Sequence, residues 1–174
     1  MQFNLTSEIH LRVKKIPIIL KVLLVLMSYV IANLENNREV MKAFSYTFGN
    51  KLFECSEKTI LTQEMAKDIL YFWDANRRLD NKETGCLIIC AMVKLKLLNS
   101  DGELMVPNAK GYLQAAGADD NMAAHLIKMY KNCKSETSST LNGCEIALEI
   151  SKCFRRGVHQ KNWTPDTSSL YKMN

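Results

Sequence analysis

Six cysteines restrict the folds open to this chain of 174 residues more than any other feature of its sequence. All of them follow residue 54, behind an apolar N-terminal leader. An even number of cysteines behind a secretory leader is typical of a disulfide framework. We therefore expect three disulfides, drawn from Cys55, Cys86, Cys90, Cys133, Cys144 and Cys153.

Helical geometry excludes two of the possible bonds. Cys86 and Cys90 lie four residues apart in an apolar segment with the helical pattern, so both side chains project from one face and should bridge to different partners. Cys144 and Cys153 lie nine residues apart in another predicted helix, on nearly opposite faces. Excluding both bonds leaves ten of the 15 pairings that six cysteines allow.

A zinc site is the rival interpretation of the cysteines. The Cys-x3-Cys and Cys-x8-Cys spacings lack the tight turn that aims thiolates at one metal, and no second close pair of cysteine or histidine accompanies them. An oxidising compartment also favours disulfides over thiolate ligands. We therefore expect neither a metal site nor another cofactor.

The first 32 residues have the order of parts found in secretory signal peptides. A basic stretch at residues 12–15 precedes an apolar run that ends in Val-Ile-Ala at Ala32. Pro17 and Lys21 interrupt this run and leave it shorter than the roughly 20 apolar residues that a membrane span needs. We predict cleavage after Ala32, with Asn36 as the alternative.

Residues 33–174 then form one domain, in which residues 163–174 are a C-terminal tail. Removing the leader takes away four Lys or Arg and one Glu, so the formal charge falls from +5 to +2. Basic and acidic residues alternate in the remainder, as at Lys82 and Glu83, whereas a nucleic-acid-binding surface clusters its basic residues. We expect a secreted protein with no nucleic-acid partner and no stable membrane insertion after cleavage.

Apolar residues recur every three or four positions along most of residues 37–159, which is the helical period. Thr62 and Asp119 are suited to the starts of helices, Pro107 suits a first helical turn, and residues 99–102 have a strong turn sequence. No segment has a strand pattern of comparable quality. The pattern predicts an all-α fold with helices over residues 37–52, 62–74, 82–95, 107–117, 119–133 and 144–159.

The cysteine spacing, C-x30-C-x3-C-x42-C-x10-C-x8-C, resembles that of insect odorant-binding proteins, and specifically that of their lepidopteran pheromone-binding branch, the PBP/GOBP family. The x3 and x8 intervals make the resemblance specific, and it covers the chain from about residue 37 to residue 165. Seven local strings also match that branch: Glu39-Val-Met-Lys42, Phe48-Gly49, Phe72-Trp73, Thr84-Gly-Cys86, Gly117-Ala-Asp119, Cys153-Phe154 and Trp163-x-Pro165.

The resemblance implies a compact bundle of about six helices around an internal apolar cavity, with three interlocked disulfides. The implied bonds, which are among the ten pairings left open above, are Cys55 to Cys90, Cys86 to Cys144 and Cys133 to Cys153. It also implies a secreted carrier in sensillum lymph that takes small hydrophobic odorants or long-chain pheromones to olfactory receptors. Such a carrier is expected to be a monomer or weak homodimer and to catalyse no reaction.

An apolar ligand requires apolar walls with a few polar groups that orient it. Related proteins clamp the ligand between two aromatic rings, and Phe48 and Phe154 are the corresponding pair here. Each of the other candidate residues is, on its own, equally compatible with an ordinary core position. The resemblance implies a ligand site formed by Met41, Phe48, Phe72, Trp73, Ile88, Met92, Leu104, Ile127, Ile150 and Phe154.

Two departures from the family change what is expected of ligand binding. Many relatives place a hydroxyl at the position of Met92, where this side chain cannot donate a hydrogen bond, and this argues against an alcohol held there. Relatives with acid-triggered release carry histidines where this chain has Met105, Val106 and Lys131, and they have a longer acidic tail. Here Asp166 is the only acidic side chain of a short tail, so we expect weak or absent acid switching through that mechanism.

Other function classes fit the sequence less well. A secreted lipid hydrolase would need a Gly-x-Ser-x-Gly elbow, which is absent, or an activated imidazole, and only His125 and His159 follow residue 32. A secreted interaction protein could use the bundle as a scaffold around a vestigial cavity. Within the carrier class, the alternative is a non-olfactory carrier of lipids or hormones.

Overall fold

A computed structural model describes residues 17–57 and 61–166 of the chain. The chain divides into two compact units, Met1–Glu35 and Asn36–Asn174. The basic stretch expected at residues 12–15 and the last eight residues of the predicted tail lie outside the described residues.

The described part of the first unit belongs to one long helix, α2 (Ile18–Ser56). Its apolar side chains between residues 18 and 31 are exposed, with Ile18 at 79%. An 18-residue window of this helix is apolar enough to cross a membrane, lies near the N-terminus and has no buried residue. A signal sequence meets the same criterion, so the helix fits the predicted leader, and cleavage after Ala32 stays a prediction.

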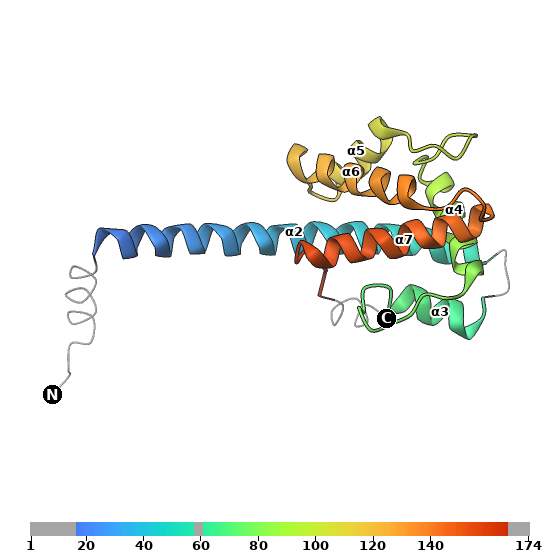
Figure 1. Cartoon of the computed structure of the whole chain (residues 1–174), viewed down its shortest axis with the longest axis horizontal. Helices are drawn as coiled ribbons and strands as arrows, with labels where there is room; N and C mark the ends of the chain where they lie inside the picture. The colour runs from blue at the N-terminus through green and yellow to red at the C-terminus, as the bar shows by residue number, and fades with distance from the viewer. Residues whose placement is uncertain (1–16, 58–60, 167–174) are drawn as a thin grey trace. The chain divides into compact units, whose positions relative to one another are not determined.

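The second unit contains the C-terminal part of α2 and five further helices (Figure 1). Across the described residues the β-structure is limited to one isolated bridge, between Leu98 and Leu104. The predicted all-α fold is confirmed. The five helices are α3 (Gln63–Leu70), α4 (Lys82–Lys94), α5 (Val106–Ala115), α6 (Asp120–Glu136) and α7 (Gly143–Gln160).

Side-chain caps determine where several of these helices begin. The Thr62 hydroxyl accepts a hydrogen bond from the backbone N–H three residues on, at the start of α3, and the Asp119 carboxylate does the same at the start of α6. At α7, Asn142 and Glu145 form a reciprocal capping box. Each cap satisfies backbone donors that the first helical turn leaves unpaired.

The helix predicted over residues 62–74 is shorter in the structure, because α3 ends at Leu70. Beyond it, Phe72 N–H donates to the Ile69 carbonyl and Asp74 N–H donates to the Tyr71 carbonyl, so the chain tightens into turns with three-residue hydrogen bonds. The indole of Trp73 then packs inward from a turn rather than from a helix. The helical spacing of apolar residues continues beyond the end of α3, and for this reason the predicted helix was too long.

Three disulfides join four of the helices, and their Cα atoms are 6.1, 4.5 and 5.6 Å apart, within the usual range. The first links α2 to α4, the second links α4 to α7, and the third links α6 to α7. This is the pairing that the family resemblance implies. The bonds are Cys55–Cys90, Cys86–Cys144 and Cys133–Cys153.

The most extensive helix packing in the second unit is between α4 and α7. Gly85, buried in α4, lies directly against the backbone carbonyl of Cys144 in α7, with no room for a side chain between them. The neighbouring Cys86 closes its disulfide to the same residue. Glycine at position 85 therefore lets the two backbones approach as closely as this disulfide requires.

We expect Gly85→Ala to lower the free energy of unfolding by about 2–3 kcal/mol, because its methyl group would overlap a backbone atom that cannot rotate away. Gly111→Ala is the matched control, since no atom lies within 4 Å of the added Cβ in α5. That control should stabilise the protein by about 0.5–1 kcal/mol. Urea unfolding with intact disulfides measures both changes, and equal effects would contradict the close approach of α4 and α7.

Candidate ligand-binding site

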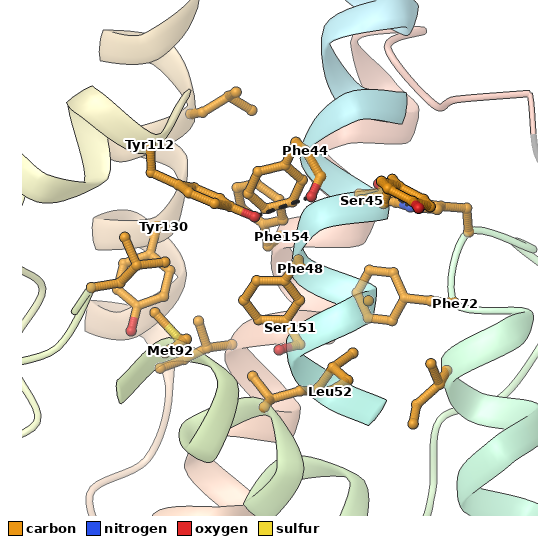
Figure 2. A pocket seen from close by; sticks show the side chains of 18 of the residues that line it. Phe44, Ser45, Phe48, Leu52, Phe72, Met92, Tyr112, Tyr130, Ser151 and Phe154 are labelled. Atoms are coloured by element: carbon orange, nitrogen blue, oxygen red, sulfur yellow. Dashed lines mark hydrogen bonds between the residues drawn. The ribbon is translucent and has the colours of Figure 1, made fainter. Parts of the chain in front are cut away.

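A cavity of about 520 Å³ lies among the helices of the second unit. Its volume is in the range of pockets that hold small organic ligands. Side chains from α2, α4, α5, α6 and α7 line it, together with α3 and the turn that follows α3 (Figure 2). Most of these side chains are apolar, and several are aromatic.

Nine of the ten residues proposed from the sequence line this cavity. Met41 is the exception, because its side chain is fully buried in the hydrophobic core and does not reach the cavity wall. The structure therefore brings together residues from six segments that are separated in the sequence. The nine are Phe48, Phe72, Trp73, Ile88, Met92, Leu104, Ile127, Ile150 and Phe154.

Phe44 joins the two phenylalanines expected to clamp a ligand. Its ring is stacked near Phe48 of the same helix, with centroids 5.9 Å apart, and lies 6.4 Å from Phe154 of α7. Tyr112 of α5 packs edge-on against Phe44 at 5.5 Å. One wall is thus a continuous set of rings from α2, α5 and α7, as Figure 2 shows.

The turn after α3 supplies the other aromatic wall. The rings of Phe72 and Trp73 are perpendicular, with centroids 4.9 Å apart, and the indole N–H of Trp73 donates to the Ser45 hydroxyl at 2.8 Å. Arg155 of α7 donates to the backbone carbonyls of Phe72 and Asp74 at 3.1 and 3.2 Å. Its guanidinium therefore fixes the turn that carries both rings.

A buried carboxylate lies at the cavity margin. Asp68 of α3 is 1% exposed, and its two oxygens accept hydrogen bonds from Thr84 and Arg77, each at 3.0 Å. Arg77 also binds Glu64 at 2.9 Å, and these two carboxylates raise the pKa of the guanidinium. Because Asp68 is fully paired, it ties α3 to α4 and offers no free charge to a ligand.

Exposed apolar residues mark the side on which the cavity reaches solvent. Tyr46 and Phe53 of α2 and Leu70 of α3 line the cavity and are 48%, 43% and 44% exposed. Within the described residues, no group of three or more His, Cys, Asp and Glu side chains could hold a metal ion. The arrangement is suited to binding an apolar molecule.

Comparison with known proteins places the chain in a family. The model of the PBP/GOBP family matches residues 37–157, well over half of the sequence. The chain belongs to this family. It is 31% identical over 136 residues to Pheromone-binding protein 2 of Epiphyas postvittana, with 78% of this chain and 82% of that protein covered.

The chain is also similar to other proteins of this kind. General odorant-binding protein 1 of Antheraea pernyi is 24% identical over 131 residues, with 75% of this chain and 78% of that protein covered. The crystal structure of Pheromone Binding Protein 3 of Epiphyas postvittana superposes with a TM-score of 0.59 at 32% identity, covering 64% of this chain and 95% of that one. The predicted family and its helical fold are confirmed.

The site expected from the sequence omits several residues that the cavity contains. Phe44 lies one helical turn before Phe48, so the apolar period of α2 was a signal that could have found it. Ser45, Tyr112 and Tyr130 had no such signal, because the rotation of each helix about its axis depends on tertiary packing. Ser45, Tyr112 and Tyr130 each place a hydroxyl group at the cavity.

We expect Ser45→Ala to destabilise the fold by about 1–3 kcal/mol, because the buried indole N–H of Trp73 would lose its acceptor. Ser151→Ala is a matched control: Ser45 and Ser151 both line the cavity and donate to the carbonyl four residues earlier, but no indole donates to Ser151. The control should change stability by less than about 0.5 kcal/mol. Thermal unfolding of the two variants makes the comparison, and similar losses would contradict it.

Proposed function

We propose that this PBP/GOBP protein is a secreted carrier that binds a small hydrophobic odorant or pheromone in its cavity and transports it to olfactory receptors. One observation supports this above the others: the aromatic-lined cavity of about 520 Å³ is formed by side chains from the helices α2 to α7 and from their connecting turns. Relatives named as pheromone-binding and general odorant-binding proteins support the same conclusion.

The energy of apolar burial is sufficient for such binding. A ligand with about 14 methylenes would gain about 11 kcal/mol on burial, at roughly 0.8 kcal/mol per methylene. Loss of translational and rotational freedom costs at least about 4 kcal/mol. The difference corresponds to a dissociation constant in the micromolar range or modestly tighter, as a reversible carrier needs.

The proposal includes neither catalysis nor a stable assembly. The buried carboxylate at the cavity, Asp68, is engaged in holding α3 to α4 rather than arranged as a base beside a nucleophile. We propose a monomer or weak homodimer. A hydrolase would cleave a chromogenic long-chain ester, whereas the proposed carrier would bind the ester and release it unchanged.

The binding experiment is displacement of N-phenyl-1-naphthylamine from the delipidated protein by long-chain acetates, aldehydes and alcohols. We expect micromolar displacement by some of them, and Phe48→Ala or Phe154→Ala should weaken it about tenfold or more, because each substitution removes apolar contact area. Met41→Ala is the control: it should lower the free energy of unfolding by about 2–5 kcal/mol and change affinity less than about threefold. A folded protein that takes up no probe would instead support the interaction-scaffold alternative.

The same assay at neutral and acidic pH tests acid release. Histidine is absent from the described residues that line the cavity, and burial raises the pKa of Tyr112, so neither kind of group changes charge there between pH 7 and pH 5. We expect ligand affinity to change by less than about threefold over this interval. A tenfold or greater loss at pH 5 would contradict this expectation and show that an acid switch exists.

The leader is tested by expression of the full chain in a secretory host. The exposed apolar half of α2 in the first unit supports removal of this segment. We expect protein in the medium whose N-terminal sequence starts at Asn33, or at Asn37 if processing occurs after Asn36. Retention of the intact chain in the membrane fraction would contradict the leader and favour an anchor.

A further inference from the structure

The cavity hydroxyls differ in whether their protons are already used. Ser45 donates to the Met41 carbonyl at 2.6 Å, Ser151 donates to the Ala147 carbonyl at 2.8 Å, and Tyr112 donates to the Phe44 carbonyl at 3.2 Å. Each of these hydroxyls has one proton, and that proton is already donated to a backbone carbonyl. They can accept a hydrogen bond from a ligand, but they can donate one only by breaking a bond within the protein.

Tyr130 of α6 is different. It lines the cavity and is partly buried, and none of the described residues accepts a hydrogen bond from its hydroxyl. In Figure 2 its ring enters from the side opposite Phe72, and the hydroxyl is directed toward the part of the view that holds Met92. A thioether is at most a weak acceptor and cannot donate, so Met92 does not compete for this role.

The surroundings of Tyr130 keep its proton in place. Burial, and then the negative charge of Glu103, raise the pKa of the phenol above its ordinary value, so the group is a neutral O–H donor at physiological pH. Glu103 itself is exposed and forms an ion pair with Lys134 at 2.6 Å. Its carboxylate is thus committed to a cation at the surface.

We propose that Tyr130 is the polar anchor of the cavity and selects ligands that carry a hydrogen-bond acceptor oxygen, such as a long-chain aldehyde, ketone or ester. This inference rests on the proposed carrier function and names the ligand class for that site. The other cavity-lining polar side chains that are not paired within the protein, Tyr46 and Asn50, are exposed at the rim and already accessible to water. A ligand oxygen bound there would gain little over its bonds to solvent.

The inventory of donors and acceptors explains the expected order of affinity. A hydrocarbon leaves the Tyr130 O–H without an acceptor in an apolar cavity, which is a cost that an aldehyde or ester avoids. An alcohol also accepts from Tyr130. Its own proton must then find an acceptor lone pair, which Ser151 or Tyr112 can supply only where the chain length places it correctly.

The test uses the full chain secreted from an expressing host, delipidated, with N-phenyl-1-naphthylamine as the displaced probe and tetradecanal, tetradecyl acetate and tetradecane as competitors. Tyr130→Phe keeps the ring and removes the hydroxyl. We expect it to weaken tetradecanal and tetradecyl acetate about 2- to 10-fold and to leave tetradecane within about twofold. Tyr112→Phe is the control, and it should change all three ligands alike because its proton already binds the Phe44 carbonyl.

Equal weakening of all three competitors by Tyr130→Phe would overturn the proposal and leave Tyr130 as a wall residue. No effect on the aldehyde or acetate would overturn it as well. Failure of the unsubstituted protein to bind any competitor would instead reject the carrier function itself, so the two failures are distinguishable.

A second measurement does not depend on the variant folding. The carbonyl stretch of tetradecanal bound to the unsubstituted protein should lie below its frequency in hexane, because a donated hydrogen bond weakens the C=O bond. A bound carbonyl that vibrates at its frequency in hexane would overturn the proposal. Loss of the shift in Tyr130→Phe, with an unchanged thermal midpoint, would assign the donor to this residue.

Discussion

The close contact between α4 and α7 is the constraint on which the rest of the second unit depends. Gly85 removes the side chain that would hold the two backbones apart, and Cys86–Cys144 closes the contact covalently. A second bond, Cys55–Cys90, leaves α4 one turn further on and holds the end of α2. Because the loops closed by these bonds span 58 and 35 residues, each bond restricts the unfolded chain by about 3–4.5 kcal/mol in the chain-entropy model. A small helical domain with a cavity needs the stabilisation that these disulfides provide, because residues around a cavity make fewer apolar contacts than residues in a filled core.

Backbone-directed hydrogen bonds make the cavity walls stiff as well as apolar. Tyr112 donates a hydrogen bond to a backbone carbonyl of α2, and Trp73 donates one to a hydroxyl of the same helix. Both aromatic walls are therefore fixed to α2. Arg155 reaches from α7 to two carbonyls of the turn after α3, and burial lowers the pKa of its guanidinium. A preorganised wall costs little conformational entropy when a ligand enters, and this favours binding by residues that are already in place.

Most of the fold could be predicted because several independent signals in the sequence indicate the same structure. Caps such as Thr62 and Asp119 agree with the apolar period, and the cysteine intervals agree with both. The failures occur where tertiary contacts override local pattern. The helix over residues 62–74 ends early because Trp73 turns inward to Ser45, and Met41 has the spacing of a cavity residue but lies in the core. Period alone determines which face of a helix is apolar, and it does not say whether that face meets another helix or an empty space.

The polar groups of the cavity divide into those that build the protein and those left for a ligand. Asp68, Thr84 and Arg77 satisfy one another, and the serine hydroxyls satisfy the helices that carry them. Gross affinity must therefore come from apolar area, which is large but discriminates weakly between molecules of similar length. Discrimination by functional group requires a buried polar atom whose bond the protein has left unmade, because an unpaired donor penalises every ligand that cannot satisfy it. An interior that pairs nearly all of its polar atoms thereby concentrates chemical selectivity in the few that remain, and a change at one of them alters which ligand class is preferred without altering the fold.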